Sequence, residues 1–83
     1  MIGSLAADVI GLCGSALFVA AFLYANISPA MNKILFNVVN LIGAILLLIS
    51  LSVHFNLAAF VLEAAWAIIA IFGLVTALRA KTS

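Results

Sequence analysis

Charged residues are nearly absent from this sequence of 83 residues, which holds three Lys or Arg and two Asp or Glu, together 6% of the chain. In soluble domains, about a quarter of the residues are charged. The formal net charge of +1 gives no basis for binding nucleic acid. These shortages argue against a water-soluble domain, and they predict no nucleic-acid partner.

Residues used in catalysis are also scarce. The single cysteine, Cys13, cannot form an intrachain disulfide and reads as a small packing residue. The sequence has no glycine-rich phosphate loop, no His/Cys metal spacing and no paired nucleophile and base. We therefore expect no enzyme, no metal and no cofactor. Because no Lys or Arg precedes the first apolar stretch, we also expect no cleaved signal peptide.

Apolar residues dominate the composition: they make up 70% of the chain, which has a mean hydropathy of +1.54. A bilayer core about 30 Å thick needs roughly 20 apolar residues per helix. The apolar runs predict helices over residues 5–26, 34–53 and 57–78. Pro29 and its polar neighbours separate the first two runs, and a short polar segment around His54 separates the others. We therefore predict an all-α integral membrane protein with three transmembrane helices, one transmembrane domain over residues 1–83, surrounded by lipid bilayer.

The cations predict how the chain is oriented. Three spans place the first loop and the C-terminus on one side, where Lys33, Arg79 and Lys81 all fall. The positive-inside rule then places the C-terminus in the cytoplasm and the N-terminus outside.

Each expected helix has a stripe of small or polar residues at steps of three and four. Such stripes are typical of helix packing in membranes, because small residues allow close backbone approach and polar residues bridge helices. The stripes predict the packing residues Gly11, Ser15, Gly43, Ala70 and Gly73.

Glu63 is the most informative residue, since it lies about two turns into the third span. A charged side chain at the bilayer centre costs roughly 2.5–3.5 kcal/mol on insertion scales. One interpretation is a proton-binding or solute-binding carboxyl. The other is a hydrogen-bonded carboxyl that joins two helices. Trp66, one turn deeper on the same stripe, either stacks on a solute or fills space between helices.

Four further polar residues are candidates: Asn40 and Asn37 for binding a proton or substrate, and His54 and Asp8 as secondary candidates. Asn40 and Asn37 in the second span either line a polar path or form interhelical amide bonds. His54 is placed for a pH response, or is an ordinary loop residue. Asp8 is either functional or simply favourable near the N-terminus of its helix.

Segments between Asp8 and Leu74 resemble a family of small, uncharacterised bacterial inner-membrane proteins often labelled permease-like. The resemblance is carried by the segments 40–44, 50–51, 55–57, 63–66 and 73–74, which read NLIGA, SL, FNL, EAAW and GL. It implies a bacterial inner (cytoplasmic) membrane location. The three-helix architecture is also similar to that of half-SWEET sugar transporters, which pair as dimers. Those proteins carry a Pro-Gln pair in their first helix, and the first span here has no proline.

Three helices are too few to enclose a solute path, so the sequence predicts a homo-oligomer, with a symmetric dimer as the default. Two functions follow. The first is a transporter or channel for a small polar solute or ion, with Glu63 as the protonatable group. The second is a structural or regulatory subunit that binds another membrane protein and transports nothing.

Overall fold

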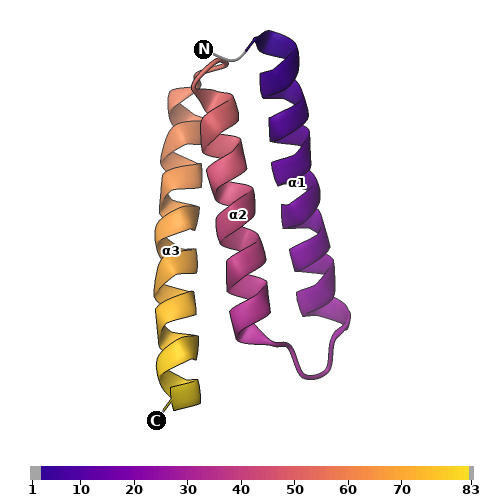
Figure 1. Ribbon diagram of the computed structural model, residues 1–83, viewed down its shortest axis with the longest axis vertical. Helices are drawn as coiled ribbons and strands as arrows, with labels where there is room; N and C mark the ends of the chain where they lie inside the picture. The colour runs from indigo at the N-terminus through magenta and orange to yellow at the C-terminus, as the bar shows by residue number, and fades with distance from the viewer. Residues whose placement is uncertain (1–2, 83) are drawn as a thin grey trace.

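The computed structural model describes residues 3–82, which form three helices: α1 (Ser4–Ile27), α2 (Lys33–Leu51) and α3 (Leu57–Thr82) (Figure 1). No strand occurs among these residues, so the prediction of an all-α chain is confirmed. The helix bounds differ from the expected ones by one or two residues in α1 and α2. α3 runs four residues further than expected, because Arg79 and Lys81 extend its last turn, where cations favour the helix dipole.

Asparagine side chains begin the second and third helices. The Oδ1 atom of Asn32 accepts from the backbone N–H groups of Ile34 and Leu35 at 3.0 and 3.1 Å. The Oδ1 atom of Asn56 accepts from the N–H of Ala59 at 3.1 Å. Such caps satisfy N–H groups that the helix itself leaves unpaired. They fix both turns, so consecutive helices run antiparallel (Figure 1).

Large apolar side chains cover the outside of the molecule. All three helices are long and apolar enough to cross a membrane. Exposed side chains include those of Leu5, Phe22, Ile27, Ile69 and Phe72. The buried apolar residues are, in contrast, four alanines, at positions 7, 21, 44 and 70. Soluble proteins rarely expose such large apolar areas, so the chain is a membrane protein whose outer surface faces lipid.

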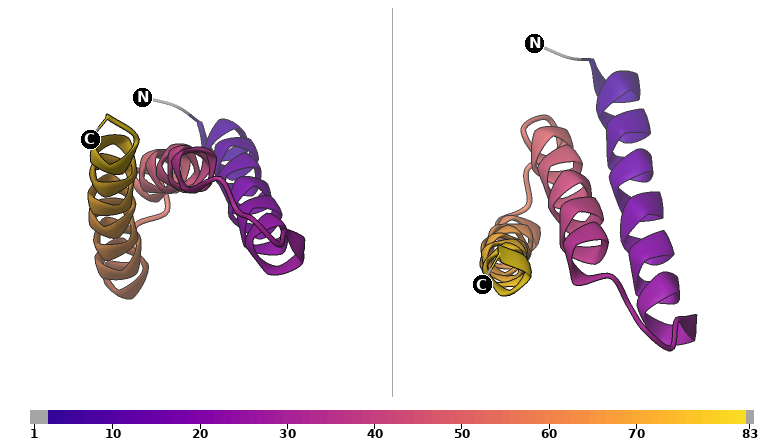
Figure 2. Two further views of the ribbon diagram at one scale, coloured as in Figure 1. Left: turned by 90° about the horizontal axis from the view of Figure 1, so that it is seen from below. Right: turned by 60° about the horizontal axis from the view of Figure 1, so that its bottom comes forward.

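α2 is the central helix. α1 and α3 each pack against α2 and not along each other (Figure 2). We call the two ends of the molecule the first-loop end, with residues 28–32 and the C-terminus of α3, and the second-loop end, with residues 52–56 and the N-terminus of α1. Because α1 and α3 do not pack along each other, one copy does not form a closed three-helix bundle.

α1 and α2 approach most closely at two glycines. A Cβ atom on Gly14 would lie 2.8 Å from the carbonyl oxygen of Gly43, and one on Gly43 would lie 3.1 Å from that of Gly14. Real Cβ atoms essentially never come within 3.0 Å, so only glycine fits at position 14. The absence of side chains lets the two backbones touch, as in other membrane helix pairs.

The packing face of α1 is rotated from the expected one. Its buried residues are Ala7, Gly14 and Ala21, spaced by seven. Gly11 lies beside this row, since a Cβ atom there would meet the Ser50 hydroxyl oxygen at 2.7 Å. Ser15 is instead exposed, and its hydroxyl donates to the carbonyl of Gly11 at 2.9 Å. Ser15 therefore takes no part in packing within this chain.

Candidate intramembrane site

An aromatic pair joins the two outer helices across α2. The missing side chain at Gly43 makes room for Phe18 of α1, because a Cβ atom on Gly43 would lie 2.7 Å from a ring carbon of Phe18. The Phe18 ring meets that of Trp66 of α3, with ring centroids 5.6 Å apart and planes tilted by 36°. This separation suits an attractive aromatic pair. The sequence singled out Trp66 and Gly43 but not Phe18.

A groove of about 290 Å³ opens beside this pair. Its walls are two further side chains of α1 together with the aromatic pair itself: Phe18, Val19, Phe22 and Trp66. Trp66 is 43% exposed and Phe22 is 70% exposed, so both rings present surface to anything entering the groove. The groove is thus apolar and mainly aromatic, and it lies between the helices that do not pack together.

Glu63 lies one helical turn from Trp66, toward the second-loop end. Its side chain is half-buried, and its Oε2 atom is fully covered without a hydrogen-bond partner among residues 3–82. Leaving a buried polar atom unpaired is costly, and more so for a carboxyl in a membrane. A group in this state needs a partner that the described part of one chain does not provide.

Asn40 is the buried polar residue of α2, with only 6% of its surface exposed. Its amide forms no hydrogen bond with another described residue. Asn37 is placed differently. Its Nδ2 atom donates to the carbonyl of Lys33 at 2.8 Å, and its amide packs directly against Gly73 of α3. Asn37 therefore takes part in packing between α2 and α3, while Asn40 remains without a partner.

The remaining packing residues lie at helix interfaces. Ala70 is 3% exposed, and Gly43 is buried between α1 and α2. Gly73 leaves the space that the Asn37 amide fills. A side chain at position 73 would displace that amide, so the two residues are matched in size.

A second polar cluster lies at the second-loop end. The Nε2 atom of His54 is 3.1 Å from Oδ1 of Asp8 and 3.3 Å from the hydroxyl of Ser4. The side chains of His54 and Asp8 are both about half exposed. Nearby, the Ser50 hydroxyl donates to the carbonyl of Ala7 at 2.8 Å. The cluster joins the start of α1 to the end of α2. Asp8 and His54 were predicted as separate candidates, and the structure brings them together.

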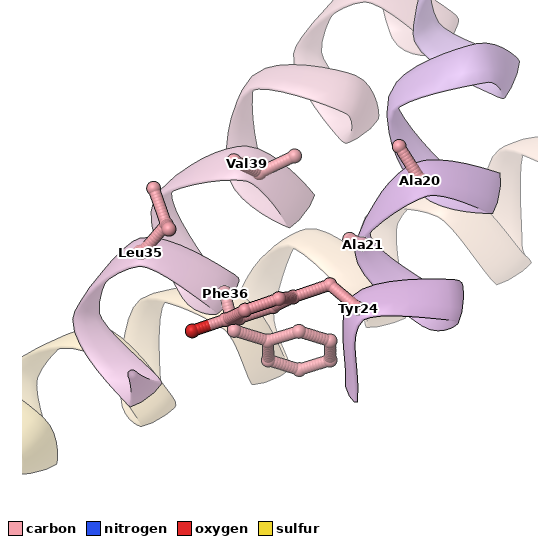
Figure 3. A pocket seen from close by; sticks show the side chains of 6 residues that line it. All are labelled: Ala20, Ala21, Tyr24, Leu35, Phe36 and Val39. Atoms are coloured by element: carbon pink, nitrogen blue, oxygen red, sulfur yellow. The ribbon is translucent and has the colours of Figure 1, made fainter. Parts of the chain in front are cut away.

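An apolar pocket of about 140 Å³ lies near the first-loop end, between α1 and α2. Figure 3 shows its lining: Ala20, Ala21, Tyr24, Leu35, Phe36 and Val39. Tyr24 reaches from α1 across to α2, and its hydroxyl oxygen accepts from the N–H of Asn32 at 2.8 Å. The pocket was not predicted, because it depends on which residues of two helices face each other. Within residues 3–82, no group of three or more His, Cys, Asp or Glu side chains is placed to hold a metal ion.

Comparison with known proteins gives one family match. The model of an uncharacterised bacterial family matches residues 7–81, which include all of α2, nearly all of α1 and α3, and every candidate site residue. No curated protein and no solved structure matches the chain. Nothing in these comparisons supports the permease-like label or the similarity to half-SWEET transporters.

Proposed function

The chain belongs to the bacterial family whose model covers residues 7–81, and we propose that it works as a homo-oligomeric transporter or channel for a small polar solute or ion. In this proposal Glu63 is the protonatable group, and Trp66 and Asn40 line the path. The membrane is the bacterial inner membrane, with the N-terminus outside and the C-terminus in the cytoplasm.

The covered and unpaired Oε2 atom of Glu63 is the observation that carries the proposal. Ionisable residues inside membranes are rare, and they commonly mark ion or proton pathways. No charged side chain of the chain's own helices lies at its level. α2 carries only Lys33, at the first-loop end, and α1 carries only Asp8, near the second-loop end. A proton or a bound cation is therefore the natural partner that would neutralise Glu63.

The open arrangement supports self-association. Apart from the contact between Phe18 and Trp66, α1 and α3 do not pack on each other, so one copy does not form a closed bundle around a route across the membrane. A symmetric dimer, the commonest closed assembly, would supply six helices and bring two copies of Glu63 into one structure. Carriers of this kind hold their sites near the midplane, at the interface between repeated units.

Transport is tested by reconstituting the protein in liposomes and imposing a pH gradient. We expect uptake of at least one solute from a broad panel of small ions and polar solutes, and we expect the uptake to collapse when a protonophore removes the gradient. Liposomes without protein are the control. Uptake equal to that control across the whole panel would contradict transport. Recovery of a stoichiometric partner protein from native membranes would then favour the structural or regulatory subunit.

A further inference from the structure

We propose that His54, Asp8 and Ser4 form a pH-sensitive latch, which holds the start of α1 against the end of α2 more firmly when His54 has taken up a proton. The three residues meet at the second-loop end, where α1 begins and α2 ends (Figure 1). The inference goes beyond the proposed function and does not depend on it, since the latch requires neither Glu63 nor a transported solute.

One ring nitrogen of His54 contacts two partners on α1. Its Nε2 atom lies 3.1 Å from Oδ1 of Asp8 and 3.3 Å from the hydroxyl oxygen of Ser4. Ser4 and Asp8 are four residues apart in the helix, so they share one face. A carboxylate only accepts hydrogen bonds, whereas a hydroxyl can donate or accept. The contact with Asp8 therefore needs a hydrogen on Nε2, while the contact with Ser4 can form with or without one.

Protonation of the imidazole favours the contact with Asp8. A neutral imidazole carries its hydrogen on either nitrogen, so only part of its population can donate from Nε2. A protonated imidazole donates from both nitrogens and adds the attraction of opposite charges. Histidine side chains gain this charge between about pH 8 and pH 5, and aspartates ordinarily lose theirs only near about pH 4. The latch therefore tightens as the pH falls from about 8 to 5.

Asp8 is the charged side chain in contact with His54 among residues 3–82. The other titratable side chains of this part of the chain are Cys13 and Tyr24 on α1, Lys33 at the start of α2, and Glu63, Arg79 and Lys81 on α3. Of those on α3, Glu63 is nearest in sequence to the second loop, and its covered Oε2 atom has no hydrogen-bond partner among the described residues. The pH response of this end is thus assigned to the His54–Asp8 pair.

The latch lies beside the first buried residue of α1. Ala7, next to Asp8, is fully buried, and its carbonyl accepts from the Ser50 hydroxyl at 2.8 Å. That hydrogen bond does not titrate in this range, so it holds the two helices together at every pH, and the latch adds the pH-dependent part. The His54 and Asp8 side chains are 48% and 59% exposed. Exposed ion pairs are weak, so we expect the latch to change the opening of this end by about two- to fivefold.

Labelling of a cysteine at the buried position 7 measures how often this end opens. The chain carries Ala7→Cys and Cys13→Ser, in lipid nanodiscs, and the neutral reagent hydroxyethyl methanethiosulfonate is followed by intact mass between pH 8 and pH 5.5. The rate in the same chain with His54→Gln is divided by the rate with His54 present, so that the pH dependence of the thiol reaction cancels. We expect this ratio to rise about two- to fivefold from pH 8 to pH 5.5. Asp8→Asn should give the same rise as His54→Gln.

Ala21→Cys is the matched control, because Ala21 is 4% exposed and ends the same buried row at the first-loop end. Its ratio should stay constant with pH. Backbone hydrogen exchange over residues 7–12, in chains that keep the native alanine and cysteine, is a second measurement that needs no introduced thiol. The same ratio of His54→Gln to wild type should rise there as well.

A ratio at the start of α1 that does not change with pH would overturn the proposal. An equal rise at position 21 would also overturn it, because it would show that the whole helix responds and not the latched end. A full pH response in the Asp8→Asn variant would overturn the assignment of the partner. Combining His54→Gln with Asp8→Asn should add nothing to either substitution alone, since both remove one contact.

Discussion

Replacing Gly14 by valine is expected to lower the free energy of unfolding by about 2 kcal/mol, within the range of about 1–3 kcal/mol for overpacked sites. A Cβ atom at this position would meet the backbone oxygen of Gly43 at 2.8 Å, and side-chain atoms of Leu47 and Leu46 at 3.0 and 3.1 Å. Backbone oxygen cannot rotate away as a side chain can, so α1 and α2 must separate. The gain in helix propensity is smaller, below about 1 kcal/mol, so overpacking decides the outcome.

The measurement is unfolding by SDS in mixed micelles, followed through Trp66 fluorescence. Ala16→Val is the matched control, because Ala16 is on the same helix and exposed, so added methyl groups point into lipid. We expect this variant to unfold within about 0.5 kcal/mol of the wild type, as is usual for surface substitutions. If the Gly14→Val variant were as stable as the Ala16→Val variant, the close approach of α1 and α2 at Gly14 and Gly43 would be contradicted.

Substituting Glu63 by glutamine is expected to reduce pH-driven flux in liposomes to the level of empty liposomes. Glutamine keeps the size and hydrogen-bonding capacity of the side chain, but its amide does not bind and release a proton in the pH gradient of the experiment. Transport that depends on protonation must therefore stop, while helix packing is maintained. Cross-linked oligomers should form as in the wild type, which separates loss of transport from loss of assembly.

Asp8→Asn is the control for this prediction. It removes the other acid of the chain, whose side chain is more than half exposed and interacts with His54 at the second-loop end. We expect its flux to stay close to that of the wild type. A Glu63→Gln variant with undiminished flux would remove Glu63 from the mechanism. A variant that no longer assembles would favour the packing role for this carboxyl.

The helices could be predicted from the sequence because the bilayer sets their length and composition. Long apolar runs with polar breaks at Pro29 and His54 leave few alternatives, and the bounds were wrong by at most four residues. The end of α3 was the least accurate. Arg79 and Lys81 read as residues beyond the membrane, yet a helix can continue past the bilayer surface when its last turn carries cations.

The surfaces through which the helices pack were harder to predict, because small residues occur in more than one possible packing row of the same helix. Steps of four favoured Gly11 and Ser15 on α1, whereas the buried row follows steps of seven through Gly14. The polar Ser15 favours packing on its row, but a serine in a helix can satisfy its hydroxyl on its own backbone, as this one does with the carbonyl of Gly11.

Contacts between apolar residues distant in sequence could not be predicted from one sequence. Phe18 has no polar atom and fits lipid as well as a helix interface, so nothing in its pattern marks it as the partner of Trp66. The Asp8–His54 contact could have been anticipated, because antiparallel neighbours bring the start of α1 to the second loop. Glu63 and Asn40 were recognised individually because polar residues inside a membrane span are rare.

The central claim is that the protein works as an oligomer, because the described part of one copy gives the covered carboxyl oxygen of Glu63 no hydrogen-bond partner. The most direct measurement counts chains in a lipid bilayer by single-molecule photobleaching, using a fluorescent protein fused to the C-terminus and a low protein density. We predict that most assemblies bleach in two or more steps. If nearly all bleached in a single step, in bilayers where the protein still catalyses pH-driven uptake, a lone chain would be sufficient and the claim would be contradicted.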